Sequence, residues 1–255
     1  MLSRLRQRRS SISASRSSFF LHGVESDTYR LPHPEYGTPV FLVLHRAIKR
    51  AFVIMRANSS ISLASLEEDD VTRILRGVLN NTLLKSGEVG GFDRSTFEQI
   101  GRQYRCVSYD GTHLAKEPDM RFNLRDHNRR DTLDTEDGIV VECKPIDDHH
   151  APGSHYCKKG IRRFVAGEYA WAMQEALMIG YVRGSRTIAQ TLLPAMKRES
   201  QKSTLATIDE PGLVELEEEG CEVLHSSRHR RNFEWRDDKG PATAITLFHS
   251  WHLAE

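Results

Sequence analysis

Residues 138–146 (GIVVECKPI) are the stretch of sequence that decides the expected fold. Isoleucine and valine favour a buried strand here. Because side chains alternate along a strand, Glu142 and Lys144 share one face, whereas Val141 and Cys143 share the other. An acid and a lysine are therefore held side by side on an apolar strand. Burying both charges is costly unless they pair with each other or bind something.

A second strand is expected just before this one, over residues 118–124 (PDMRFNL). Met120 and Phe122 alternate with polar residues there, and Asp119 begins the strand. A charged loop over residues 125–137 joins the two strands. The pair can bring Asp119 close to Glu142, and two carboxylates suit Mg²⁺, a hard cation that prefers oxygen ligands.

Helical spacing of apolar residues predicts a helix over residues 65–84, and Ser65 followed by Glu68 is typical of a capping box at its start. A second helix is expected over residues 161–177, with a short buried strand behind it at 179–182. The type of the apolar segment 40–55 stays open. The remaining expectations are a short helix at 94–104, a strand at 104–109, a helical piece at 186–199 interrupted at Pro194, a flexible connection at 202–211, and strands at 221–226, 232–236 and 243–249.

This order of helices and strands indicates an α/β fold with a mixed central β-sheet flanked by helices. We expect a single domain over residues 26–255, with the motif within about 65–182 and extra C-terminal strands within 220–250. Residues 1–25 form a basic tail rich in Ser and Arg, which we expect to be disordered. Its first 18 residues contain no acid, so the composition also fits an organelle transit peptide.

The net charge of +1 excludes a protein that binds nucleic acid through its bulk charge. Local basic clusters can still contact phosphate. No apolar run is long enough for a transmembrane helix, so no membrane partner is expected. Four scattered cysteines without a CxxC motif favour a reducing, cytoplasmic setting.

Asp119 after Pro118, followed by Glu142-Cys143-Lys144 on an apolar strand, resembles the motif of the PD-(D/E)xK, or restriction-endonuclease-like, nuclease superfamily. The fold of that superfamily has a helix, a strand hairpin that holds the motif, a second helix and further strands. The order expected over residues 65–182 is similar. The resemblance therefore implies a restriction-endonuclease-like core.

The resemblance implies a nuclease that hydrolyses phosphodiester bonds, of DNA in the first place, with Mg²⁺ as cofactor and Mn²⁺ as a substitute. Asp119 and Glu142 would hold the metal together with the Cys143 carbonyl. Lys144 would orient or help to deprotonate the attacking water and stabilise negative charge. A role as effector in restriction or antiviral defence follows by analogy. Targeting would come from a partner protein or from homo-oligomerisation.

Glu68 has two interpretations that the sequence leaves open. In such nucleases a glutamate from the preceding helix often joins the metal site, and Glu68 is the candidate here. Equally, Glu68 completes the expected capping box, and acids are common at helix N-termini in any case.

Basic residues supply the candidate contacts to nucleic acid. At the expected start of the helix from residue 161, cations would oppose the helix dipole unless they face phosphate. Simple surface charge is the alternative there. The same two interpretations apply to the later basic segment 227–231. The candidates are Lys158, Lys159, Arg162, Arg163, Arg228 and Arg230.

Other chemistries have weaker support. His149, His150, His155 and Cys157 lie close together, but their spacing matches no standard zinc site. No Walker-type phosphate loop and no serine nucleophile elbow are present. The main alternative to an enzyme is a catalytically inactive protein with the nuclease fold that binds nucleic acid or assembles with a partner. An unrelated α/β enzyme, with Glu142 and Lys144 as a structural pair, is a further alternative.

Overall fold

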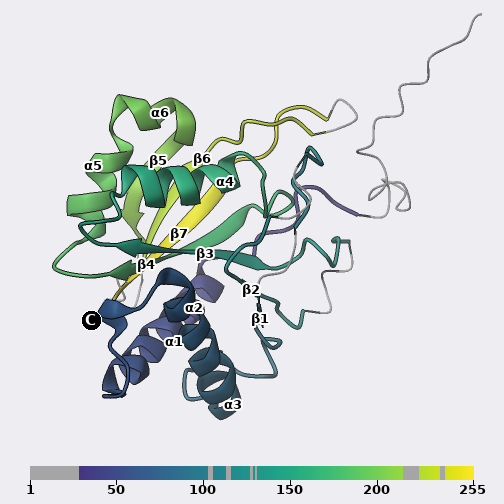
Figure 1. Ribbon diagram of the computed structural model, residues 1–255. Coiled ribbons are helices and arrows are strands. Elements are labelled where there is room, and N and C mark those ends of the chain that lie inside the picture. The colour runs from purple at the N-terminus through teal and green to yellow at the C-terminus, as the bar shows by residue number, and fades with distance from the viewer. Residues whose placement is uncertain are drawn as a thin grey trace, which may run out of the picture.

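A mixed sheet of seven strands forms the centre of the computed structural model, in the spatial order β1-β2-β3-β4-β7-β6-β5 (Figure 1). β3, β4 and β7 are parallel, and the other neighbouring pairs are antiparallel. The structure describes residues 29–102, 106–112, 116–126, 129, 131–214, 224–235 and 239–255. The strands are β1 Gly101–Arg102, β2 Met120–Phe122, β3 Ile139–Ile146, β4 Glu175–Val182, β5 Thr207–Leu213, β6 His225–His229 and β7 Ile245–Leu253.

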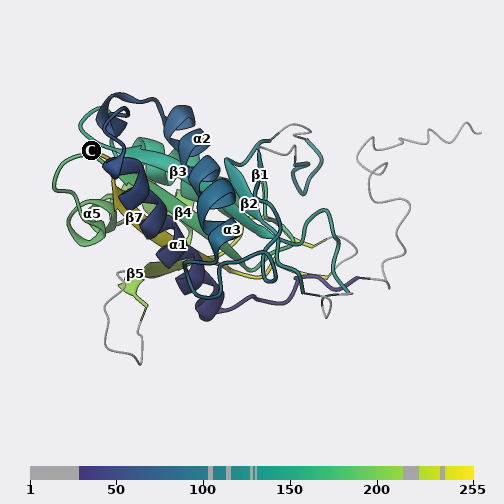
Figure 2. The same cartoon turned by 90° about the horizontal axis from the view of Figure 1, so that it is seen from below.

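Helices cover both faces of this sheet, so the α/β class is confirmed. α1, α2 and α3 lie on one face, where Figure 2 shows them in front of the strands. The other face carries α4, α5 and α6. The helices before β1 are α1 Thr38–Ala57, η2 Leu63–Ser65, α2 Glu68–Val78, η3 Leu79–Leu83 and α3 Leu84–Ser86. The helices after β3 are η4 Gly153–Ile161, α4 Arg162–Val165, η5 Ile188–Leu192, α5 Leu193–Met196 and α6 Glu199–Leu205.

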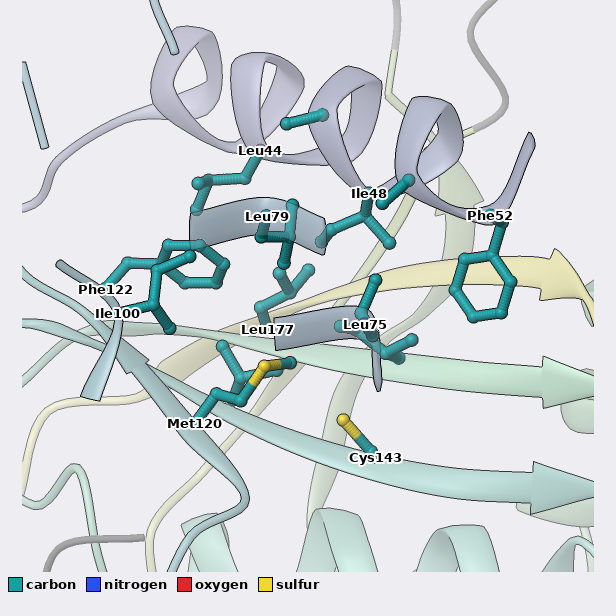
Figure 3. Packing of buried hydrophobic residues seen from close by; sticks show 14 of the residues in the cluster. Leu44, Ile48, Phe52, Leu75, Leu79, Ile100, Met120, Phe122, Cys143 and Leu177 are labelled. Carbon is teal, nitrogen blue, oxygen red and sulfur yellow. The ribbon is translucent and has the colours of Figure 1, made fainter. Parts of the chain in front are cut away.

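The segment whose type the sequence left open is helix α1. Leu44, Ile48 and Phe52 recur at intervals of four residues, so they point from one side of the helix toward the sheet (Figure 3). Phe41 stacks on Phe248 of β7, with ring centroids 3.9 Å apart. Burial of this apolar face anchors the helix to the strands.

β3 divides its side chains between two cores, as the alternation predicted. Val141 and Cys143 pack with α1 and α2. Val140 and Ile146 pack on the opposite face, with η4 and α4. The expected position of β2 is also confirmed, because it pairs Met120 with Val141 in an antiparallel register.

The helix predicted over residues 161–177 is wrong in its bounds. Helical structure begins at Gly153 and ends at Val165, and Gly167 and Ala170 then adopt positive φ angles of 64° and 51°. Left-handed backbone cannot continue a right-handed helix. Residues 175–182 are instead strand β4, buried at every position. A parallel strand covered on both faces shows no alternation, which explains why its first half resembled a helix.

The helix that begins near residue 65 was predicted correctly in place but not in its cap. Ser65 lies in the preceding turn η2, and its hydroxyl donates to the carbonyl oxygen of Ser62. α2 begins at Glu68 with no side-chain hydrogen bond at its N-cap, Glu67. The expected capping box is therefore absent, and the Glu68 carboxylate is available for another contact.

Several shorter predictions need correction. No helix forms within the described part of 94–104, where a turn that Asp93 stabilises leads to β1. The described part of 104–109 contains an isolated β-bridge at Cys106 and no strand. The connection at 202–211 is α6 and β5. The described part of 232–236, residues 232–235, has only an isolated bridge at Glu234. The two other late strands appear as β6 and β7, whereas 221–223 and the tail at 1–25 lie outside the described residues.

The helical piece predicted near Pro194 is confirmed as η5 and α5. Pro194 occupies the first turn of α5, where the missing N–H is tolerated. Within the part of the chain that the structure describes, no helix combines the length and the apolar character that crossing a membrane requires.

Candidate functional site

The candidate site lies beside β3, at the point where β2 begins. β2 pairs with β3 only over Ile139, Val140 and Val141, so the following residues of β3 extend beyond the hydrogen-bonded ladder on that side. Asp119, the residue before β2, lies at this point. Its Oδ2 accepts a hydrogen bond of 2.6 Å from the Cys143 N–H. The predicted approach of Asp119 to the Glu142–Lys144 segment is therefore observed.

The Lys144 ammonium lies among three carboxylates. Its Nζ is 2.6 Å from Oε1 of Glu68, 2.9 Å from Oε1 of Glu142 and 3.9 Å from Oδ2 of Asp119. It also donates to the Cys143 carbonyl at 2.6 Å. Thus α2, the residue before β2, and β3 each contribute an acid to one buried lysine.

Glu142 is the most enclosed of the three acids, with 1% of its side chain exposed. Besides Lys144, its Oε1 accepts a hydrogen bond of 2.8 Å from Nη1 of Arg163 in α4. Its Oε2 accepts a short hydrogen bond from the Tyr169 hydroxyl. Both oxygens of Glu142 are therefore engaged by groups of this chain.

Glu68 connects the buried network to solvent. It lies in the first turn of α2, where the helix dipole favours an acid. Its side chain is 29% exposed, against 7% for Lys144 and 11% for Asp119. The missing capping box and the contact with Lys144 favour the interpretation of Glu68 as part of the site.

Burial changes the proton affinities in this cluster. It raises the pKa of Asp119 from 3.8 to about 7, and the Glu142 carboxylate adds to the rise. Burial also raises the pKa of Glu68, although Lys144 opposes that rise. For Lys144, burial alone would lower the pKa, but Glu142, Asp119 and Glu68 outweigh it and raise that pKa above its usual value. Lys144 is therefore a cation near neutral pH.

The site has the oxygen donors that Mg²⁺ prefers, with a lysine placed between them. Three carboxylates face two cations, Lys144 and Arg163, so one negative charge remains when all five groups are ionised. In the described residues, no three His, Cys, Asp or Glu side chains form a group ready to hold a metal ion. The donor set fits a hard cation in kind, and the Lys144 ammonium occupies the space between the donors.

The predicted basic residues fall into two places. Lys158, Lys159, Arg162 and Arg163 follow one another through η4 and α4, and Arg163 reaches Glu142. The dipole argument for them was wrong, because the helical segment begins at Gly153. Lys158 and Lys159 lie near its middle, and Arg162 and Arg163 lie in its last turn, where cations are favoured. Arg228 and Arg230 are exposed in and just after β6, with β4 and β7 between that strand and β3.

The structure adds contacts for two polar residues. Tyr169, which the sequence allows either at the site or in the core, is fully buried, and its hydroxyl contacts Glu142 and lies 3.3 Å from Arg163. Arg231 was grouped with a basic surface segment; it is buried and donates to the carbonyls of Trp171 and Ala170 at 2.6 and 2.8 Å. The alternation along β6, in which Ser227 and His229 point inward, could have predicted that Arg231 is buried.

The histidine-rich segment does not form a zinc site within the described residues. Nδ1 of His150 lies 2.7 Å from Oδ1 of Asp147, and its ring packs edge-on against His155. Cys157 is buried in the apolar core, and burial raises the pKa of its thiol to about 12. These contacts make the segment a structured turn after β3.

Comparison of the chain with family models, with curated proteins and with solved structures found no match.

Proposed function

We propose that this protein is a metal-dependent nuclease of the PD-(D/E)xK type. The observation that carries the proposal is the convergence of Glu68, Asp119 and Glu142 on Lys144 at the edge of β3. A lysine and several acids, brought from three separate segments to one end of the β2–β3 ladder, can hold a metal ion and assist the hydrolysis of a phosphodiester. The order α2, β1, β2, β3, α4, β4 agrees with the order that the resemblance implies.

Each side chain has a distinct role in the proposal. Asp119, Glu142, Glu68 and the Cys143 carbonyl would hold Mg²⁺, or Mn²⁺ in its place. When bound, the metal would lower the pKa of an attacking water and neutralise charge on the phosphoryl group. Lys144 would orient that water and stabilise negative charge as an ammonium group. Its raised pKa favours this role over that of a proton acceptor.

Arg163 and Tyr169 would act as positioning residues. They hold both oxygens of Glu142 through hydrogen bonds, and Arg163 brings a second cation to the site. Lys158, Lys159 and Arg162 are exposed along the same helical segment. They extend the positive charge outward from Glu142, where it would attract the phosphate backbone of DNA. Targeting by a partner or a second copy also belongs to the proposal. The setting in defence rests on analogy alone, and the cytoplasmic location rests on the few scattered cysteines.

One observation favours the alternative of an inactive nuclease fold. Glu142 is enclosed and already satisfied by Lys144, Arg163 and Tyr169, as in a structural ion network. Such a protein would bind nucleic acid or a partner without cleaving. Substitution Lys144→Ala separates the two functions, because an enzyme would lose cleavage and keep binding, whereas an inactive binder has no cleavage to lose.

The direct test is incubation of the full chain with plasmid, single-stranded DNA and RNA in Mg²⁺, Mn²⁺ or EDTA. We expect cleavage of DNA with either metal, none in EDTA, and none by an Asp119→Ala variant that is shown to be folded. Cleavage that persists in EDTA or in that variant would overturn the proposal. Absence of cleavage with every substrate and metal, together with retained binding, would support the inactive alternative.

A further inference from the structure

A cavity of about 680 Å³ lies at the carboxyl ends of the parallel strands β4 and β7. Val182 and Leu253, the last residues of these strands, line it, and none of its lining residues belongs to the candidate nuclease site. In open α/β sheets, ligands commonly bind beyond the carboxyl ends of parallel strands. The volume is within the usual range for small-molecule sites.

One face of α1 forms a wall of this cavity. His45, Lys49, Phe52 and Arg56 recur at helical spacing, so their side chains follow one stripe of the helix. The stripe places Lys49 about one turn and Arg56 about three turns beyond the buried His45. A third cation, Arg186, comes from the segment after β4.

The charged side chains that line the cavity are all cations. Lys49, Arg56 and Arg186 are accompanied by three histidines, and among the described residues no aspartate or glutamate lines the cavity. Arg186 is held in place by an ion pair with Asp148 and by a 2.6 Å hydrogen bond to the Arg183 carbonyl. Cations gathered around a concave apolar surface favour an anion over a neutral ligand.

The rest of the lining is apolar and partly aromatic. Phe52, Trp251 and Ile188 contribute flat or branched surfaces. Gly180 leaves the room for the indole, since a Cβ there would lie 2.6 Å from Cδ1 of Trp251. Aromatic surfaces beside cations suit a ligand with both a planar apolar body and a phosphate.

We propose that this cavity binds a nucleotide-sized organic phosphate, with its phosphate toward Lys49, Arg56 and Arg186 and its planar body against Phe52 and Trp251. The proposal does not depend on the proposed nuclease activity, because the two sites share no residues.

The test is isothermal titration calorimetry of the full chain with ATP, AMP, adenosine and inorganic phosphate in buffer that contains EDTA, which prevents metal-assisted binding at Glu142. We expect one equivalent of ATP or AMP to bind, and adenosine and phosphate each to bind at least about tenfold more weakly. The double variant Lys49→Gln/Arg56→Gln should weaken nucleotide binding by at least about tenfold. Arg46→Gln, an exposed cation on the same helix that does not line the cavity, is the matched control and should bind as the wild type does.

Saturable binding of neither ATP nor AMP would overturn the proposal, as would equal affinities for the wild type and the folded double variant. Binding of phosphate or adenosine as tightly as ATP would also overturn it. If the double variant does not fold, Ala189→Trp provides a test without a change of charge, because an indole at this lining position narrows the cavity and should weaken nucleotide binding. Unchanged nucleotide affinity in that variant would contradict the assigned site.

Discussion

Nζ of Lys144 lies 2.6 Å from Oε1 of Glu68, so the first turn of α2 is tied to the middle of the sheet 76 residues further along the chain. Glu68 is more exposed than the other two acids around this lysine. Its carboxylate is therefore the side of the network from which a cation or a phosphate can approach.

Substitution Glu68→Gln should reduce Mg²⁺-dependent cleavage by at least about tenfold, because it removes one charged oxygen ligand while it keeps the shape of the side chain. Asp69→Asn is the matched control, since this exposed acid lies in the same turn of α2. The measurement is the initial cleavage rate as a function of Mg²⁺ concentration. If the cleavage rate falls equally in the two variants, Glu68 acts only as an acid that stabilises the helix N-terminus.

Substitution Lys144→Met should lower the free energy of unfolding by about 3 kcal/mol at pH 7, because buried carboxylates lose their shared cation. Lys159→Met, an exposed neighbour in η4, should change it by less than about 0.5 kcal/mol. Urea denaturation followed by circular dichroism measures both values. A small loss for Lys144→Met would mean that the carboxylates do not depend on this ion pair.

The raised pKa of Asp119 makes stability depend on pH. The folded protein binds more protons than the unfolded chain between the ordinary pKa of 3.8 and the folded value of about 7. This group therefore lowers stability progressively as pH rises through that window, and its effect is level above it. Relative to the wild type, Asp119→Asn should gain stability from about pH 4 to about pH 7. A difference between the two unfolding curves that does not vary across this window would refute the assignment.

Substitution Tyr169→Phe should lower the cleavage rate and alter its pH profile, because it frees one oxygen of Glu142 from a hydrogen bond. The expected loss of stability is about 1 kcal/mol. Tyr156→Phe is a suitable control, since its buried hydroxyl bonds to His249 and not to the site. If both variants show the same pH profile as the wild type, Tyr169 has a packing role only.

Much of the site could be predicted because its information is local. The alternation in β3 assigned Glu142 and Lys144 to one face, and the β2–β3 pairing brought Asp119 to them. The contact of Tyr169 with Glu142 could not be predicted, because Gly167 and Ala170 adopt left-handed backbone that ends the helix and leaves no periodic pattern. The first residues of β4 were predicted as the end of a helix, because burial on both faces removes the alternation that identifies a strand. The cavity beside α1 depends on contacts between distant segments.

A metal-dependent nuclease site at Glu142 is tested most directly by the single-turnover rate of DNA cleavage in saturating Mg²⁺, measured for the wild type and for Glu142→Gln at equal concentrations of folded protein. We expect cleavage by the wild type that EDTA abolishes, and a rate at least about 100-fold lower for the variant, since a charged metal ligand becomes a neutral amide. Equal rates for the two proteins would contradict a metal-dependent nuclease site at Glu142.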